Sequence, residues 1–255
     1  MTQVALVTGA ARGIGAAVAR RLVADGWRVV AVDVCADDPA LPYSLATRAE
    51  LDALADVTSV VADVRDVDAL AMAVAVAEST YGGLDAAFAV AGVIAGGAPH
   101  WETSVAAEDV VLDVDLRGVL NLARVAVPAL LRRPQPRTGR FVAVASSAAV
   151  SGLPMLAAYC AAKSGVAGFV RGLAADLRGT GVTANAIAPG STDTAMLAES
   201  ARLYGLASVA EFATQQPVER LLTPDEVAAA AVWLAGQDNG GITGALLPVD
   251  GGLTL

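Results

Sequence analysis

The sequence is poor in cysteine, histidine, aromatic residues and charged residues. Its 255 residues include two cysteines, one histidine and 4% aromatic residues, and 17% of its residues are charged. Because two cysteines make no disulfide framework, we expect a reducing compartment, the cytoplasm. No cluster of cysteine, histidine and carboxylate residues has the spacing of a metal site, so no metal ion is predicted.

Long hydrophobic runs are also lacking. A membrane-spanning helix needs roughly 18 apolar residues, and the longest run here, residues 227–236, reaches about half that length. A first strand expected from residue 4 leaves no room for a signal peptide. The net charge of −9 disfavours nucleic acid and anionic membranes as partners, although a local loop can still bind a nucleotide.

The residues that are abundant point to a large core with one regular pattern. Hydrophobic residues make up 55% of the chain, and short apolar runs alternate with longer alanine-rich stretches of helical period. The predicted strands are 4–8, 28–33, 59–63, 85–90, 140–145, 183–187 and 246–249. The predicted helices are 13–25, 67–81, 105–131, 157–177 and 225–235. This alternation predicts an α/β fold, a doubly wound, Rossmann-like parallel sheet covered on both faces, in a single domain over residues 1–255.

Two segments interrupt the alternation, residues 35–48 and residues 189–217. Both follow predicted strands, so both are expected at the carboxyl edge of the sheet, where such folds bind ligands. We expect the second, from about 190 to 217, to form a lid.

A glycine-rich loop joins the first strand to the first helix. Gly9, Gly13 and Gly15 have the spacing G-x-x-x-G-x-G. Without side chains, they let a pyrophosphate approach the free N–H groups of the helix N-terminus. A glycine-rich helix entry without a ligand is the alternative, but a strand precedes the loop and Asp33 follows it.

The predicted cofactor is NAD. Asp33 ends the second strand, where a carboxylate accepts both ribose hydroxyls and repels a 2′-phosphate. Arg12 acts in the opposite sense, because a cation near that ribose attracts the phosphate of NADP. We expect the carboxylate to dominate. Asp63 is a candidate for the adenine amino group, with an ordinary strand-end aspartate as the alternative.

Tyr159 and Lys163 are the candidate acid/base pair. Residues four apart share one helix face, so the phenol and the ammonium can point into one cleft, and Ser146 precedes them by 13 residues. An ordinary tyrosine, with a pKa of about 10, is no base near neutrality, but a neighbouring cation favours the phenolate. Alone, Tyr159 would be a core residue and Ser146 a strand-end cap; Ser147 could also take the place of Ser146.

In an ordered set of segments, the chain resembles the short-chain dehydrogenase/reductase family over essentially its whole length. The matching residues are Thr8–Gly15, Ala91, Gly92, Ser146, Tyr159, Lys163, 185–190, Thr243, Gly244 and 250–252. The resemblance implies that Tyr159 exchanges the substrate proton, that Ser146 holds the substrate oxygen, and that Lys163 also binds the nicotinamide ribose. It further implies a homotetramer with residues 157–177 and the C-terminal segment in its interfaces.

The resemblance also supplies the full set of cofactor-binding candidates. They are Gly9, Arg12, Gly13, Ile14, Gly15, Asp33, Asp63, Val64, Ala91, Gly92, Tyr159, Lys163, Pro189, Thr192 and Thr194. Thr194 lies in the segment that contacts the carboxamide in the family, and Ile187 is a candidate for packing on the nicotinamide ring.

Two positions depart from the family pattern. The asparagine pair that commonly precedes Ala91 and Gly92 is Ala89 and Val90 here. The fourth catalytic residue of the family, usually an asparagine, corresponds to Asp115, and Asn121 is no obvious substitute. An aspartate can still hold a water of the proton relay, and it stabilises Lys163 as a cation but opposes the phenolate if it lies close.

Residues 35–48 resemble an insertion in the actinobacterial subgroup associated with the redox cofactor mycofactocin. Their two prolines and Tyr43 predict an ordered flap beside the adenosine. The subgroup implies an NAD that is tightly held and recycled in place by an external, mycofactocin-type acceptor. A surface excursion without function is the alternative.

The predicted function is interconversion of a secondary alcohol and a ketone, with a small-molecule substrate that has apolar bulk. The apolar bulk is inferred from the expected lid, which carries Met196, Leu197, Leu203, Tyr204 and Leu206. The alternatives are a 3-oxoacyl thioester reductase and a nucleotide-binding sensor without turnover. His100 is expected at the surface or in a pocket wall, not as a base.

Overall fold

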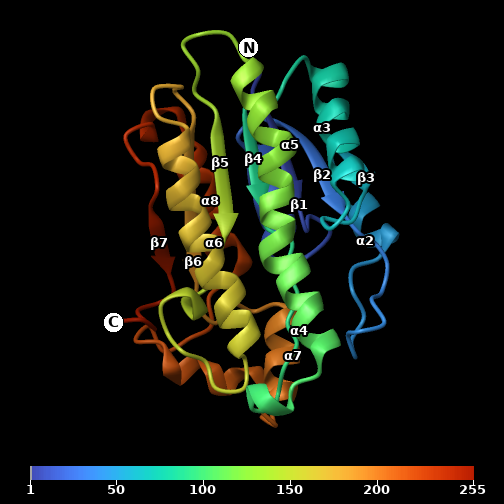
Figure 1. The fold of residues 1–255 in the computed structure, drawn as a ribbon, viewed down its shortest axis with the longest axis vertical. Coiled ribbons are helices and arrows are strands. Elements are labelled where there is room, and N and C mark those ends of the chain that lie inside the picture. Colours follow the sequence, from blue (N-terminus) through green and yellow to red (C-terminus); the bar gives the residue numbers. More distant parts are fainter. Residues whose placement is uncertain (1) are drawn as a thin grey trace.

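A seven-stranded parallel sheet forms the centre of the computed structural model, which describes residues 2–255 (Figure 1). The strands lie in the order β3-β2-β1-β4-β5-β6-β7. They are β1 Val4–Thr8, β2 Arg28–Asp33, β3 Val57–Val61, β4 Ala86–Ala89, β5 Arg140–Val144, β6 Thr183–Pro189 and β7 Leu246–Val249. Every residue of β1, β4, β5 and β6 is buried, as expected for central strands covered on both faces.

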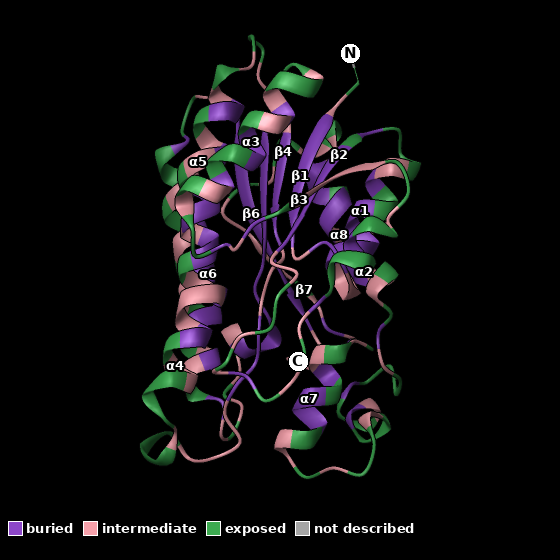
Figure 2. Cartoon of the chain, turned by 90° about the vertical axis from the view of Figure 1, so that its right-hand side faces the viewer, coloured by how far each residue is buried: buried purple, intermediate pink, exposed green. Residues whose placement is uncertain are grey.

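Helices cover both faces of the sheet. They are α1 Gly13–Ala24, α2 Arg48–Asp52, α3 Val67–Tyr81, α4 Val105–Val111, α5 Gly118–Arg132, α6 Ala157–Asp176, α7 Ala195–Leu203 and α8 Pro224–Ala235. Figure 2 shows α3, α5 and α6 on one side of the buried sheet and α1 and α8 on the other. Each side has its own apolar core, so both faces of the sheet are sealed. The predicted α/β, doubly wound architecture is therefore confirmed.

The strand order changes direction between β1 and β4. From β1 the chain proceeds to β2 and β3 on one side, and then returns to β4 on the other. In doubly wound folds, the crevice at the carboxyl ends of these two strands is where a ligand binds. The loops that begin at Gly9 and Val90 leave the sheet at this point.

Three predicted elements differ from the structure. The third strand is Val57–Val61 rather than 59–63, so Asp63 lies in the loop beyond it. The long helix predicted over 105–131 is divided into α4 and α5 by a π-helical turn, η2, over Leu112–Arg117. The segment expected as a lid contains a helix, α7, whereas the flap of residues 35–48 has none of its own and ends where α2 begins.

Candidate active site

The glycine-rich loop packs so closely against its neighbours that it excludes side chains. A Cβ atom on Gly9 would lie 2.7 Å from the backbone of Ala91, and one on Gly15 would overlap the carbonyl oxygen of Gly9. Gly13 adopts a φ of 57°, in the left-handed region that favours glycine. No side chain caps the N-terminus of α1, so its free N–H groups remain available to an anion.

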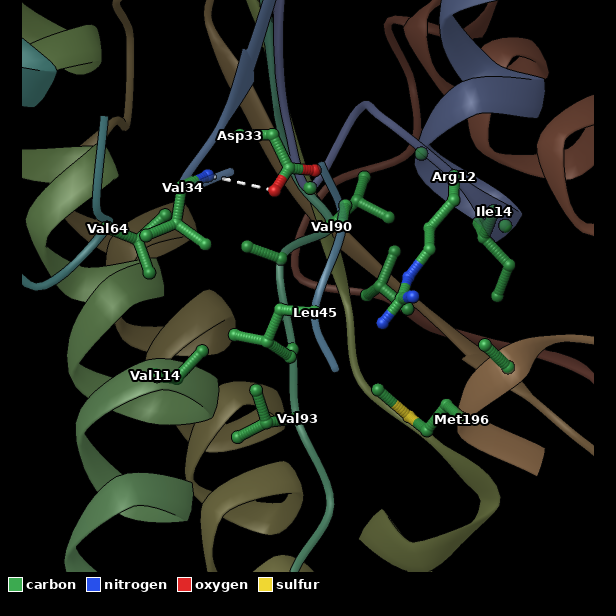
Figure 3. A pocket seen from close by; sticks show the side chains of 18 of the residues that line it. Arg12, Ile14, Asp33, Val34, Leu45, Val64, Val90, Val93, Val114 and Met196 are labelled. Carbon is green, nitrogen blue, oxygen red and sulfur yellow. Dashed lines mark hydrogen bonds between the residues drawn. The ribbon is translucent and has the colours of Figure 1, made fainter. Parts of the chain in front are cut away.

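Asp33 is held at the end of β2 by two backbone hydrogen bonds. Its carboxylate accepts one from the N–H of Ala11 at 2.9 Å and one from the N–H of Val34 at 2.8 Å, the latter drawn in Figure 3. Both Asp33 and Arg12 line the cavity. The guanidinium of Arg12 donates to the carbonyl oxygen of Ser44 at 3.0 Å, so the flap engages the cation that would otherwise attract a 2′-phosphate.

The predicted adenine-side residue, Asp63, is part of a charged cluster. Arg65 donates to both carboxylate oxygens of Asp63 and also reaches Asp38 of the flap at 2.7 Å. The hydrogen bonds that Arg65 donates to Asp63 and Asp38 raise the pKa of its guanidinium, so it stays charged. Asn121 of α5 donates from its amide to the carbonyl oxygens of Val64 and Arg65, which fixes the loop that carries the cluster. Sequence reasoning identified neither Arg65 nor Asn121 as part of this site.

The flap of residues 35–48 is ordered and lies against the cavity. The phenol oxygen of Tyr43 accepts a hydrogen bond of 2.9 Å from the N–H of Ile94, beyond β4. Leu41, Tyr43 and Leu45 line the cavity, and Figure 3 shows Leu45 and Arg12 pointing into it. Burial raises the pKa of Tyr43 to about 12, so this contact is made by a neutral phenol. The flap therefore bridges the two loops that leave the sheet at the switch point.

Ser146, Tyr159 and Lys163 come together at the other end of the same cavity. Ser146 follows β5, and the two residues of α6 are one helical turn apart. The ammonium of Lys163 donates to the carbonyl oxygen of Val144 at 3.2 Å and lies 5.5 Å from the centre of the Tyr159 ring. Ser147 begins a 3-10 turn, is buried and does not line the cavity, so the structure favours Ser146.

The environment of Tyr159 contains opposing influences on its acidity. Burial raises the pKa of its phenol; the Lys163 cation and the Ser146 hydroxyl lower it, and the Asp115 carboxylate raises it. The net pKa lies above the ordinary value, so the protonated phenol is the form favoured near neutrality in the protein alone. A further positive charge beside the phenol would favour the phenolate.

Asp115 is completely buried in η2, and it touches Lys163. One carboxylate oxygen accepts from the N–H of Val93 at 2.7 Å, and the other lies 3.2 Å from the Lys163 ammonium. Burial alone would lower the pKa of Lys163, but the Asp115 carboxylate, with a smaller effect from Tyr159, outweighs burial and raises that pKa. Burial raises the pKa of Asp115, whereas the Lys163 cation and the Val93 N–H favour its carboxylate form, so the two buried groups hold each other in the charged state.

The absent asparagine pair before Gly92 has a local replacement. The hydroxyl oxygen of Thr8 accepts hydrogen bonds from the N–H groups of Val90 and Ala91 at 3.1 and 3.4 Å. Thr8 in turn donates to the carbonyl oxygen of Phe88 at 3.3 Å. The loop after β4 is thus tied to the end of β1 without an asparagine side chain.

The expected lid region packs against the catalytic end. Thr194 caps α7 by accepting from the N–H of Leu197, and Met196 lines the cavity. The phenol of Tyr204 donates to the carbonyl oxygen of Pro154 at 2.9 Å, which ties the end of α7 to the loop before α6. The side chain of Gln216 exchanges hydrogen bonds with the backbone of Ser191, which anchors the far end of the segment.

Most of the predicted site residues line one cavity. Its empty space, counted into the open solvent at its mouth, is about 1320 Å³. The predicted residues that line it are Gly9, Arg12, Gly13, Ile14, Gly15, Asp33, Asp63, Val64, Ala91, Gly92, Ser146, Tyr159, Lys163, Pro189 and Thr194.

Four predicted residues do not line the cavity, and one of them, Asp115, is completely buried beside Lys163. Thr192 donates to the carbonyl oxygen of Gly190, and it forms a β-bridge with Leu222 instead. Ile187 is fully buried in the core beneath α1 and α8, so its expected packing on the nicotinamide is wrong. His100 is exposed, 3.9 Å from Glu108, and lines no part of this cavity.

Residues 2–255 lack two kinds of feature. No helix there has both the length and the apolar character required to span a membrane. That part of the chain also contains no group of three or more histidine, cysteine, aspartate or glutamate residues placed to hold a metal ion.

The fold and this constellation define a class of protein, the nucleotide-dependent oxidoreductases of the Rossmann-like type. A family model described as enoyl-(acyl carrier protein) reductase matches residues 9–254. The chain is 40% identical to cis-4-hydroxycyclohexanecarboxylate dehydrogenase of Sinomonas cyclohexanicum, over 99% of this chain and 96% of that protein. It is 35% identical to (-)-trans-carveol dehydrogenase of Rhodococcus erythropolis, over 99% and 98% of the two chains.

The structure of carveol dehydrogenase from Mycobacterium avium in complex with NAD superposes with a TM-score of 0.92. Its sequence is 29% identical, and the match covers 98% of this chain and 97% of that one. The chain belongs to the short-chain dehydrogenase/reductase family, and it is an oxidoreductase that uses a nicotinamide cofactor. The predicted family and enzyme class are thereby confirmed, and the comparison agrees with NAD as the cofactor.

Proposed function

We propose that this protein is an NAD-dependent oxidoreductase that interconverts a secondary alcohol and a ketone, with Tyr159 as the acid/base. One observation carries the proposal: Ser146, Tyr159 and Lys163 line the same cavity as the glycine loop and Asp33. A cofactor bound by the loop and a substrate held by Ser146 would therefore lie in one continuous space. When bound, NAD supplies the chemistry of hydride acceptance and donation that this chain's side chains lack.

The residues present fit a dinucleotide. Gly9 and Gly15 leave a cradle that a Cβ atom would fill, and the uncapped N-terminus of α1 faces it. Asp33 has a fixed carboxylate for the ribose hydroxyls, and Val64 and Asp63 lie at the adenine side. Lys163, Pro189 and Thr194 line the nicotinamide side in this proposal. The carboxylate of Asp33 makes NAD the preferred form over NADP.

The chain's own chemistry is the movement of one proton. In oxidation, Ser146 orients the substrate hydroxyl and the Tyr159 phenolate takes its proton as the carbon loses hydride and becomes a ketone. In reduction, the Tyr159 phenol returns that proton to the developing alkoxide. Lys163, paired with Asp115 and next to the Tyr159 ring, would stabilise the phenolate and bind the nicotinamide ribose.

An uncharged cyclic alcohol or ketone is the substrate class that the cavity favours. Its charged lining residues other than Lys163 lie in the glycine loop, at the end of β2, in the flap and beyond β3: Arg12, Asp33, Asp38, Asp63 and Arg65. Val93, Val110, Val114 and Met196 make the rest of the wall apolar. The relative named for carveol acts on an uncharged cyclic alcohol, which supports this class. The relative named for hydroxycyclohexanecarboxylate supports the cyclic alcohol alone, because its substrate carries a carboxylate.

The flap supports a cofactor that is retained between turnovers. Three contacts hold it over the cavity, Arg12 to Ser44, Tyr43 to Ile94, and Asp38 to Arg65. Since a bound dinucleotide could leave only after these contacts open, the flap favours a slowly exchanging NAD that is reoxidised in place. A mycofactocin-type acceptor would serve as its oxidant. Assembly into a homotetramer, with α6 in an interface, remains part of the proposal.

The Tyr159→Phe variant tests the proposed chemistry. We expect turnover of the best substrate among cyclohexanol, trans-carveol and their ketones to fall by at least about 100-fold, because the proton acceptor is lost. Binding of NADH, followed by its fluorescence, should stay close to that of the wild type. Tyr81→Phe is the matched control, since its hydroxyl contacts Thr58 at 2.6 Å on the edge of the sheet and does not line the cavity.

Retention of wild-type turnover by Tyr159→Phe would show that the mechanism is wrong. Turnover of acetoacetyl-coenzyme A without turnover of the cyclic compounds would show that the substrate is a 3-oxoacyl thioester instead. Each assay is run with free NAD and again with an artificial dye acceptor, because a retained cofactor would give turnover only with the dye.

A further inference from the structure

The catalytic lysine of this protein has an internal counter-ion. Lys163 and Asp115 are 3% and 0% exposed, and their charged atoms are 3.2 Å apart. The family usually has an uncharged asparagine at the position of Asp115, so the net charge beside the phenol would there be that of the lysine alone. Here the two buried charges oppose one another.

The charged and polar groups that act on the phenol come from three parts of the fold. Lys163 and Cys160 lie on α6 with Tyr159, Ser146 follows β5, and Asp115 lies in η2. Tyr43 of the flap is close enough to sense the Asp115 charge, but it is neutral below its own pKa of about 12. Glu199 of α7 also faces Tyr43, and it is paired with Arg202 at 2.6 Å. Asp115 is therefore the anion that opposes Lys163 at the phenol.

We propose that Asp115 is a positioning residue that holds Lys163 as a fixed cation while offsetting its charge at Tyr159, so that the site is biased toward the proton-donating phenol. This inference rests on the proposed acid/base role of Tyr159. It deepens that role by assigning the pH ranges of the two half-reactions: alcohol oxidation requires a higher pH than an asparagine at position 115 would require, and ketone reduction persists to a higher pH.

The sign of the pH effect follows from the charges. In Asp115→Asn, the new amide oxygen and the carbonyl oxygen of Val144 can both accept from the Lys163 ammonium, so we expect Lys163 to keep its charge. With no anion to oppose it, that cation favours the phenolate. Oxidation needs the phenolate, so the acid limb of the pH–rate profile for oxidation should move to lower pH in Asp115→Asn. Reduction needs the phenol, so the alkaline limb of the pH–rate profile for reduction should also move to lower pH. A residue that only stabilised the fold would lower both rates without moving either limb.

A titration of the cofactor-free protein tests the charge arrangement without turnover. In every tyrosine, the ring carbon that bears the hydroxyl is isotopically labelled and observed by nuclear magnetic resonance. The resonance that is missing from the spectrum of Tyr159→Phe belongs to Tyr159. We expect Tyr159 to begin its titration about one pH unit or more lower in Asp115→Asn than in the wild type. Asp113→Asn is the matched control, because Asp113 carries the same charge in the same η2 turn but pairs with Arg117 at the surface.

Lys163 provides a second measurement that needs no variant. It is the one lysine of the sequence, so its labelled side chain gives a single resonance. In the wild type we expect Lys163 to remain protonated throughout the pH range in which Tyr159 titrates. Loss of the Lys163 proton before that of Tyr159 would overturn the proposal, as would superimposable Tyr159 titrations in wild type and Asp115→Asn.

The pH–rate profiles complete the test, with kcat/KM measured in both directions on the best cyclic alcohol and its ketone. Downward movement of both limbs in Asp115→Asn, with both unmoved in Asp113→Asn, supports the assigned pH ranges, whereas unmoved limbs in Asp115→Asn overturn the proposal. If no variant or wild type turned over any substrate, the proposed function would fail, while the titrations would still decide the charge arrangement.

Discussion

At the scale of single residues, Asp33 illustrates how the backbone prepares a side chain for a ligand. Two backbone N–H groups, from Ala11 and Val34, fix its carboxylate at the cavity wall. The nearby cation, Arg12, is occupied by the carbonyl oxygen of Ser44. A carboxylate that is fixed and a guanidinium that is engaged both disfavour an additional phosphate on the ribose.

The Asp33→Ala variant should therefore relax the preference for NAD. We expect the ratio of the dissociation constants of NADPH and NADH to fall at least about tenfold, which corresponds to removing one unfavourable charge contact of about 1.4 kcal/mol. Binding is measured by titration with each nucleotide. Asp52→Ala is the control, because it removes an exposed carboxylate on α2 that pairs with Arg48. An unchanged ratio in Asp33→Ala would contradict the assignment of Asp33 to the ribose.

The site residues that the sequence predicts are those whose role depends on local spacing. Tyr159 and Lys163 are one helical turn apart, and the glycines open a helix directly after a strand, so a short stretch of sequence determines each geometry. Arg65 and Asn121 escape such reasoning, because they meet only when α5 packs beside the loop after β3. No spacing in the sequence signals a contact between residues 56 or 57 positions apart.

At the scale of secondary-structure elements, the flap of residues 35–48 links the two halves of the site. Its Tyr43 accepts from Ile94 beyond β4, and its Asp38 pairs with Arg65 beyond β3. A segment tied at both sides of a cavity resists opening, and each hydrogen bond of this kind contributes about 1 kcal/mol.

Tyr43→Phe removes one of these ties while keeping the ring in its place. We expect the dissociation of NADH to accelerate by about fivefold, the effect of losing one hydrogen bond of about 1 kcal/mol. Stopped-flow displacement of NADH by excess NAD measures this rate. Tyr81→Phe loses a phenol of the same size at the contact with Thr58, remote from the cavity, and should leave the rate unchanged. Equal rates in Tyr43→Phe and the wild type would mean that this contact does not control cofactor release.

Helices and strands could be predicted from the sequence where the spacing of hydrophobic residues alone defines them. The buried runs of β1, β5 and β6 and the helices α1, α3, α6 and α8 match the pattern to within a few residues. The π-helical turn η2 was not predictable, because one wide turn leaves the helical period on either side nearly unchanged. That turn carries Asp115, so the least predictable element contains the least typical residue of the site.

At the scale of the whole molecule, the doubly wound sheet brings distant segments to one edge. The glycine loop, the flap, the loop after β4, the end of β5 with the start of α6, and α7 all meet at the carboxyl ends of the strands. Because the strand order reverses between β1 and β4, that edge is open at its centre, where a dinucleotide would bind. The architecture followed from the sequence, whereas the shape of the cavity depends on loops that only the structure places.

The most direct test of this account is the nucleotide content of the purified protein. The protein, freshly prepared without added cofactor, is denatured, and the released nucleotides are separated and quantified against protein concentration. We predict close to one NAD or NADH per chain and little NADP, since the flap covers a site shaped for NAD. A protein that releases no dinucleotide and binds no added NADH would contradict the account.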